Sequence, residues 1–345
     1  MIFRKKYIWW GVCLLGLVLL LLGSVCLSLS TGELNLNPIQ AFSLLLSDGS
    51  SHPVAYELIT QIRWPRILLG IGVGGALSLS GVILQGIFRN PLVEPFTLGI
   101  SGGASLGVAV VIVTGLHILL GAFILPLAGF AGAFLVILLV YTISVGKGGV
   151  RVQHMLLVGV MVSFIASSAM MFLMSVSNTE ELHGIVFWMM GSLDEPNHQL
   201  ISLTLITTAG GLFLSYFFVQ PLNALRLGEE KALHLGIDTN LTIRILFVLS
   251  SLLAGICVSV AGVIGFVGLI IPHILRMFLG SDYRILLVSS CLLGSSFMVL
   301  SDLLARTIIA PNELPIGVIT GLIGGVVFIV LMVRKQRHLS VPHQN

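Results

Sequence analysis

Residues 7–29 read YIWWGVCLLGLVLLLLGSVCLSL, and this uncharged run decides the class of the protein. A helix needs about 20 mainly apolar residues to cross roughly 30 Å of hydrocarbon, and this run is long enough. Arg4, Lys5 and Lys6 precede it, as basic residues also precede the core of a secretory signal. The apolar stretch is longer than the core of a signal, however, and no small-residue cleavage site follows. We therefore predict that it is a retained transmembrane helix.

Similar runs recur along the 345 residues of the chain. Hydrophobic residues make up 56% of the chain and charged residues only 9%, and the mean hydropathy is +1.08. A soluble domain carries about 25% charged residues, so soluble cores could not hide this much apolar surface. The net charge of +3 is too small to indicate nucleic-acid binding. We expect an all-α polytopic membrane protein with a single transmembrane domain over residues 1–345.

Breaks at proline, glycine, asparagine and charged residues divide the chain into ten predicted spans. The spans are Tyr7–Leu29, Pro65–Phe88, Phe96–Leu116, Ile118–Val145, His154–Met174, Leu200–Val219, Leu241–Val260, Gly265–Leu279, Ile285–Ala305 and Pro315–Val333. The seventh and eighth spans are hard to separate, because residues 260–268 contain no polar break. The eighth span is also short for a full crossing.

The basic residues predict the orientation of these spans, because cytoplasmic loops carry an excess of Lys and Arg. With the N-terminus inside, all but three of the 17 Lys and Arg residues fall on the inside. Ten spans then place the C-terminus inside as well. Arg63, Arg66 and Arg306 are left outside and need a separate explanation.

The positions of the remaining charged residues limit the possible transport mechanisms. Carriers driven by ions usually hold ionisable groups near the bilayer midplane. Here the acids fall in predicted loops, Glu94 in an inside loop among them, and Asp302 lies near a helix end. No G-x-x-x-x-G-K-[ST] phosphate loop is present, and the closest lysine, Lys147, is followed by Gly148. The four cysteines show no CxxC spacing and the nine histidines no H-E-x-x-H pair, so no metal or catalytic site is expected. Either the chain is a passive channel, or another subunit supplies the energy.

Several motifs, in this order along the chain, resemble one family. They are Arg63-Trp64-Pro65-Arg66, Gly81-Val82-Ile83-Leu84-Gln85-Gly86, Arg89-Asn90-Pro91-Leu92, Glu94-Pro95, Leu98-Gly99-Ile100-Ser101-Gly102-Gly103-Ala104, Trp188-Met189-Met190-Gly191-Ser192, Leu227-Gly228-Glu229-Glu230, Leu235-Gly236, Gly265-Phe266-Val267-Gly268-Leu269-Ile270-Ile271-Pro272-His273, Asp302 with Arg306, and Glu313-Leu314-Pro315-Ile316-Gly317. The chain is identified by them as similar to the iron-siderophore, haem and cobalamin permeases (FecCD type) of type II ABC importers. One departure is Gly324-Gly325-Val326, which replaces the Gly-x-Pro often found in the last span.

This resemblance implies a permease without catalytic residues, cofactor or metal of its own, in the bacterial cytoplasmic membrane. Such a permease works as a homodimer with two ATPase subunits, which bind ATP and Mg, and with an extracytoplasmic substrate-binding protein. A heterodimer stays open, as does the cargo: an iron-siderophore complex, haem or cobalamin. The rival hypothesis is a stand-alone channel or an ion-coupled carrier.

The resemblance also implies roles for particular residues. The three outside arginines, Arg63, Arg66 and Arg306, would accept glutamates from the binding protein, since a guanidinium pairs with a carboxylate in a two-pronged geometry. The alternative is that they snorkel to lipid phosphates.

The inside segment Leu222–Asp238 reads as two short amphipathic helices joined at Gly228. By resemblance this segment is the coupling segment, which docks in a groove of the ATPase subunit. The residues expected to make that contact are Leu225, Gly228, Glu229, Glu230 and Leu233. A loose amphipathic loop is the alternative.

The fifth span is rich in methionine, and by resemblance the fifth and tenth spans line the central path of the dimer. Methionine is soft and adaptable, which would suit a bulky cargo, although it can equally serve simple packing. The turn at Gly149–Gln153 aligns with the cytoplasmic gate of the family. The candidate pathway and gate residues are Arg151, Val152, Met155, Met170 and Met174.

Overall fold

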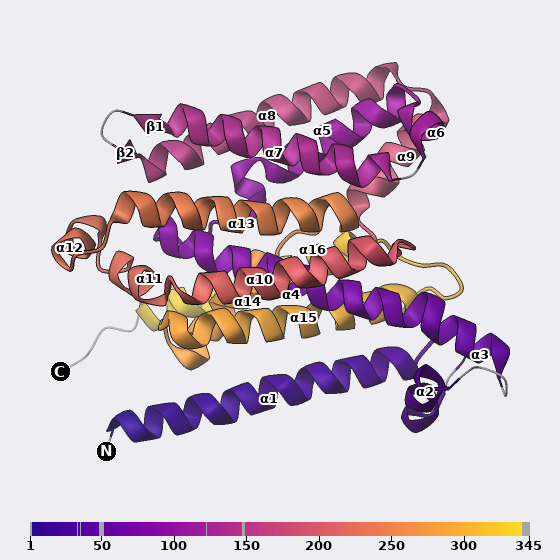
Figure 1. Ribbon diagram of the computed structural model, residues 1–345, viewed down its shortest axis with the longest axis horizontal. Coiled ribbons are helices and arrows are strands. Elements are labelled where there is room, and N and C mark those ends of the chain that lie inside the picture. Colours follow the sequence, from indigo (N-terminus) through magenta and orange to yellow (C-terminus); the bar gives the residue numbers. More distant parts are fainter. Residues whose placement is uncertain are drawn as a thin grey trace.

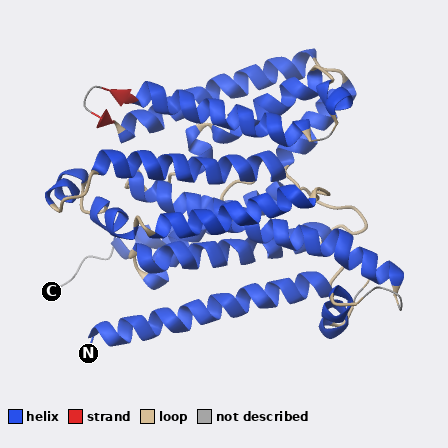
Figure 2. Ribbon diagram, viewed as in Figure 1, coloured by secondary structure: helices blue, strands red, loops and turns tan. Residues whose placement is uncertain are grey.

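The computed structural model describes residues 2–32, 34, 36–47, 52–121, 123–146 and 149–339. Regular structure in these residues is helical apart from one short hairpin (Figure 2). The elements are α1 (Ile2–Ser30), α2 (Pro38–Leu45), α3 (Pro53–Glu57), the π-helix η1 (Leu58–Arg63), α4 (Trp64–Ile87), the 3-10 helix η2 (Pro95–Leu98), α5 (Ile100–Val113), α6 (Leu116–Leu120), α7 (Ile124–Ser144), β1 (Val145–Gly146), β2 (Gly149–Val150), α8 (Val152–Val176), α9 (Thr179–Met190), α10 (His198–Tyr216), α11 (Val219–Leu225), α12 (Glu229–His234), α13 (Thr239–Ala261), α14 (Val267–Leu279), α15 (Tyr283–Thr307) and α16 (Ile316–Leu339).

Each predicted span has a helix in the described part of the chain. Eight helices are long and apolar enough to cross a membrane, and the shorter apolar helices α5 and α14 account for the other two. The boundary between the seventh and eighth spans lies at residues 262–266. Gly262 follows α13 with φ at 73°, a left-handed conformation in which glycine commonly ends a helix.

Two predicted spans begin too early. The third starts as an α-helix only at Ile100, because Pro95–Leu98 form a 3-10 turn that ends at Gly99 with φ at 82°. The fourth starts at Ile124, because Gly121, with φ at 80°, separates the short helix α6 from α7. In both places a glycine in the left-handed region interrupts an apolar run that sequence composition alone reads as continuous.

The structure adds elements that the spans did not include: α2, α3, α9 and the β1–β2 hairpin. Of these, α9 has a clear local signal. The Asn178 side chain accepts a hydrogen bond from the Glu181 N–H at 2.9 Å, and the Glu181 carboxylate accepts one from the Asn178 N–H at 3.1 Å. This reciprocal capping box is readable in the sequence as Asn-x-x-Glu ahead of an apolar run.

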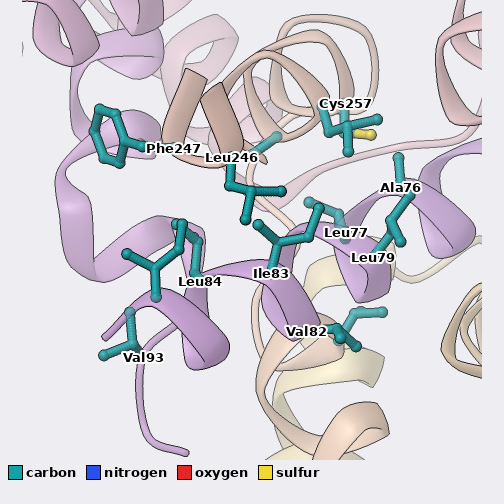
Figure 3. Close-up of a cluster of buried hydrophobic side chains, with 14 of the residues drawn as sticks. Ala76, Leu77, Leu79, Val82, Ile83, Leu84, Val93, Leu246, Phe247 and Cys257 are labelled. Atoms are coloured by element: carbon teal, nitrogen blue, oxygen red, sulfur yellow. The ribbon is translucent and has the colours of Figure 1, made fainter. Parts of the chain in front are cut away.

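Helix α4 lies at the centre of the bundle and packs against α10, α13, α14 and α15. Helices α5, α7 and α8 pack together as a separate group, and α13 lies between this group and α4 (Figure 1). Helix α1 lies at the opposite edge, against α15. The core where α4 meets α13 is drawn in Figure 3 and includes Leu77 and Ile83 of α4 with Leu246, Phe247 and Cys257 of α13.

Small residues let these helices approach closely. A Cβ added to Gly74 or to Gly81 on α4 would overlap backbone atoms of Gly294 on α15 or of Gly268 on α14. Gly103 and Gly107 on α5 allow the same close approach, since added Cβ atoms there would meet the carbonyls of Gly132 and Ala128 on α7. Membrane helices gain their association from such close packing, because lipid provides no hydrophobic drive.

The bundle has two ends, which we name after the predicted orientation (Figure 1). The outer end holds α2, α3, α6 and α9. The inner end holds the hairpin, α11, α12 and the first residues of α1. The candidate sites are divided between these two ends and the group of α5, α7 and α8.

Candidate docking, coupling and pathway sites

Arg66 and Arg306 meet at the outer end around one carboxylate, in a network that we call the outer ion cluster: Arg66, Asp302, Arg306 and Glu313. Arg66 Nε and Nη2 donate to Asp302 Oδ1 at 3.2 and 2.9 Å, and Arg66 Nη1 donates to Glu313 Oε2 at 2.7 Å. Arg306 Nε donates to Asp302 Oδ2 at 3.0 Å. The Asp302 side chain is only 2% exposed. Asp302, a buried acid of α15, therefore links Arg66 on α4 to Arg306 on α15.

Two of the arginines also hold helix α1. Arg306 Nη2 donates to Ser28 Oγ at 2.8 Å. Arg63 is 2% exposed and donates to the carbonyl of Leu29 and, at 2.8 Å, to that of Leu34. The Arg63 guanidinium thus satisfies the Leu29 carbonyl at the end of α1, where the backbone of the helix offers no partner, and also binds the segment that follows.

The outer arginines thus do not have the surroundings that the docking hypothesis expected. Arg63, Arg66 and Arg306 turn inward to protein partners instead of facing water or lipid phosphates. The sequence could not reveal the partners of Arg66, because Asp302 and Glu313 lie more than 230 residues beyond it. Glu313, with its side chain 48% exposed, is the accessible member of the outer ion cluster. Docking by the arginines stays a prediction.

The predicted coupling segment has the expected form at the inner end. Helices α11 and α12 are joined at residues 226–228, and Gly228 adopts φ at 111°. The predicted apolar side divides into two sets, however. Of the predicted apolar residues, Leu222, Leu225 and Ala232 are buried in the core, whereas Leu233 and Leu235 are exposed. Leu227, outside the predicted set, is exposed as well. Leu225 therefore supports the segment from within, while Leu233 is exposed, and contact of either leucine with an ATPase subunit stays a prediction.

Glu229 connects the coupling segment to the end of α4. Arg89 Nη2 donates to Glu229 Oε1 at 3.0 Å, and both side chains are more than one third exposed. Arg89 has φ at 50°, an unusual conformation for a residue other than glycine. Glu230 is exposed beside Glu229 in the first turn of α12, where acids interact favourably with the helix dipole. Their contact with an ATPase subunit stays a prediction.

Four methionines line a cavity of 270 Å³ between α5, α8 and α9. Its lining consists of Ser101, Gly102, Ser105, Ala166, Ser167, Met170, Met171, Met174, Met189 and Val263. Met170 and Met174 are therefore placed together, as the pathway hypothesis requires, and Met171 and Met189 join them. Met155 is fully buried in the core instead and does not line this cavity, and its part in a pathway or gate stays a prediction. The spacing of the methionines along the sequence did not show which of them face the cavity.

The predicted gate residues lie where the hairpin leads into α8. β1 and β2 pair antiparallel, with Val145 opposite Val150. The Val150 N–H donates to Asn240 Oδ1 at 3.0 Å, which attaches the hairpin to α13. Arg151 is exposed just before α8, and Val152 is buried in its first turn. Gating by Arg151 and Val152 stays a prediction.

Glu94 is a site that the sequence reasoning missed. It was expected in an inside loop, but it reaches the backbone of Phe266 at the start of α14, and its Oε2 is buried without a partner among the described residues. It lines a cavity of 390 Å³ with Phe96, Thr97, Val160, Ser163, Phe164 and Ser167. Helix α14 has only 13 residues, so its first turn lies inside the bundle. Glu94 is buried because its loop packs against this first turn.

Comparison with known proteins places the whole bundle in one family. The model of the FecCD transport family matches residues 19–334. The chain is 34% identical to the hemin transport system permease protein HmuU of Yersinia pestis, over 95% of this chain and 97% of that protein. It is 37% identical to the vitamin B12 import system permease protein BtuC of Klebsiella pneumoniae, over 94% of each.

A solved structure shares the fold as well. It is a transporter assigned to the metal-chelate type of ABC transporter, in an inward-facing conformation. Its TM-score to this chain is 0.82, at 34% sequence identity, covering 93% of this chain and 98% of that one. The ten apolar helices, the order of the sequence motifs and these matches agree. The chain is a membrane protein of the FecCD transport family.

Proposed function

We propose that the chain is the membrane-spanning permease subunit of an ATP-driven importer of an iron-siderophore complex, with haem and cobalamin as alternative cargoes. The observation that carries this proposal is the family match over residues 19–334. The relatives named for hemin and vitamin B12 transport and the metal-chelate neighbour support a large, chelated-metal cargo. A stand-alone channel or ion-coupled carrier has no comparable support.

The cargo pathway would follow α8. The methionine cavity and the cavity beside Glu94 both include Ser167, so they lie along the same helix. Thioether side chains adapt to irregular surfaces, and the serines offer hydroxyl groups without fixed charge. Such a lining would let a bulky chelate pass without holding it tightly.

The exposed leucines Leu227, Leu233 and Leu235 would dock in the ATPase subunit. An amphipathic helix that lays its apolar face in a groove is a common way to join two proteins. The ion pair between Arg89 and Glu229 would then carry motion from α12 to the end of α4. Helix α4 packs against α10, α13, α14 and α15, so its displacement would alter the packing around the pathway.

Docking of the binding protein would involve the outer ion cluster. Arg66 is shared between buried Asp302 and half-exposed Glu313. A glutamate from the binding protein could take the place of Glu313 without uncovering Asp302. The resemblance adds a second copy of the permease, two ATPase subunits and a bacterial cytoplasmic membrane with both termini inside.

Growth and uptake after deletion of the gene test the proposal. Cells lacking the permease should lose uptake of one cargo from a panel of iron-siderophore complexes, haem and cobalamin. Return of the wild-type gene should restore that uptake. Unchanged uptake across the panel, in cells without a second importer for these compounds, would contradict the proposed cargo class.

A further inference from the structure

Three arginines from different parts of the chain line one cavity of 220 Å³ at the inner end, which we call the inner arginine pocket. Its lining consists of Gln85, Gly86, Arg89, Pro91, Arg226, Arg276, Ser281 and Tyr283. The end of α4, the residue after α11, the last turn of α14 and the loop before α15 therefore meet there.

Two of the three arginines have only neutral partners in the described part of the chain. Arg226 Nη1 donates to the Ser281 carbonyl at 2.5 Å. Arg276 Nη1 donates to the Gln85 side-chain carbonyl, and Arg276 also bonds the Tyr283 hydroxyl. Among the described residues, only Arg89 of the three has a carboxylate partner, that of Glu229. Like charges that share a partly closed space raise its potential and attract an anion.

The acid in the neighbouring loop does not neutralise this charge. Asp282 pairs with Lys6 at 3.3 Å and accepts from Asn223 at 3.2 Å. Partial burial would raise the pKa of Asp282, but bonds from the Arg284 N–H, Asn223 and Lys6 outweigh that effect and leave the pKa lowered. Its charge is therefore committed to other partners, and the pocket keeps an excess of positive charge.

We propose that the inner arginine pocket binds the phosphate of an anionic phospholipid. Basic pockets between transmembrane helices on the cytoplasmic side are suited to such headgroups. The pocket lies where α4 and α14 end and α15 begins, which is the level expected of the headgroups. Met277 and Phe278 follow Arg276 and are 57% and 69% exposed, so acyl chains can lie beside them. A phosphate is held by Arg226 and Arg276, and the Tyr283 hydroxyl accepts from Arg276 and keeps its own proton to donate.

Native mass spectrometry of the full-length protein, with added phosphatidylglycerol or neutral phosphatidylcholine, tests this site. We expect one phosphatidylglycerol to bind more tightly than phosphatidylcholine. Each basic residue near anionic lipid contributes about 1 kcal/mol, which is roughly a fivefold change in affinity. Arg226→Gln should therefore weaken phosphatidylglycerol binding about fivefold, and Arg226→Gln with Arg276→Gln should weaken it further.

Arg284→Gln is the matched control, because Arg284 is exposed at the start of α15 and does not line the pocket. It should bind phosphatidylglycerol like the wild type. Arg226→Gln is the informative variant should the double variant misfold, since Arg226 is exposed and has one backbone partner. Equal binding of the two lipids, or wild-type binding by Arg226→Gln, would overturn the proposal. Displacement of the lipid by millimolar inorganic phosphate, or by the ATPase subunit, would assign the pocket to free phosphate or to a protein carboxylate and would also overturn it.

Discussion

The arginines at the two ends of the bundle have opposite surroundings. At the outer end, Arg66 and Arg306 share the buried carboxylate of Asp302, and Glu313 adds a second acid. At the inner end, Arg226 and Arg276 have carbonyl, amide and hydroxyl partners but no carboxylate among the described residues. Both groups consist of arginines close to helix ends, and the sequence distinguishes them by the predicted side of the membrane but not by their partners.

The difference separates two uses of arginine in a membrane protein. A guanidinium whose charge is balanced within the chain stabilises the helices that it joins. One whose charge is not balanced within the chain is available to a lipid or a partner. The outer arginines therefore serve mainly to stabilise the fold. In the outer ion cluster, only the exposed Glu313 carboxylate could be replaced by a carboxylate of a partner protein.

The largest effect should come from removing Asp302. Asp302→Ala leaves Arg66 and Arg306 buried without their shared acid, and breaking a buried ion pair in this way costs about 3–5 kcal/mol. We expect a strongly lowered unfolding midpoint in detergent. Asp194→Ala is the control, since Asp194 is an exposed acid of the outer end. Similar midpoints for the two variants would show that the outer ion cluster does not stabilise the bundle.

An intermediate effect should come from reversing the charge at the inner end. Glu229→Lys places a positive charge against Arg89 and should lower transport per ATP hydrolysed by roughly fivefold, for a lost contact of about 1 kcal/mol. Exchange of both charges, Arg89→Glu with Glu229→Arg, should restore part of the coupling. Glu230→Lys, at an exposed position without an ion pair in the described chain, provides the comparison. Equal loss in Glu229→Lys and Glu230→Lys would contradict a role for the pair.

The smallest effect should come from Glu313. Its bond to Arg66 is half exposed, so the pair is worth about 0–1 kcal/mol. Glu313→Gln should remove the charged partner of Arg66 Nη1. Binding of the substrate-binding protein should then be up to about fivefold tighter at low salt. Weaker binding than in the wild type would mean that Glu313 itself makes the contact. Arg306→Glu is less informative, because it would place an acid beside buried Asp302 and disturb the fold.

Much of the fold was readable from the sequence, because a bilayer imposes a length and a composition on each span. The ten spans and their order are confirmed, and the two helices around Gly228 are found where the amphipathic pattern put them. The start of α5 and the division of α6 from α7 were missed, since Gly99 and Gly121 break the helix by backbone conformation and not by polarity.

The sites were less predictable, because they depend on contacts between distant residues. Arg66 and Arg306 stood out in the sequence, and Asp302 stood out together with Arg306, but nothing in the sequence showed that Asp302 also pairs with Arg66 of α4. Glu94 lies in a loop as expected, but its burial was not foreseen, because nothing in the sequence shows that α14 begins inside the bundle. Met155 and Met170 looked equivalent until the packing of α8 placed one in the core and the other at a cavity.

ATP-driven uptake in proteoliposomes tests the proposed function most directly. The purified permease would be reconstituted with its ATPase subunit, with ATP enclosed on the ATPase side and the labelled iron-siderophore complex and binding protein outside. We predict accumulation of the complex that requires ATP, the ATPase subunit and the binding protein together. Uptake by the permease alone, whether down a concentration gradient or driven by a proton or sodium gradient, would contradict it and would identify a channel or an ion-coupled carrier.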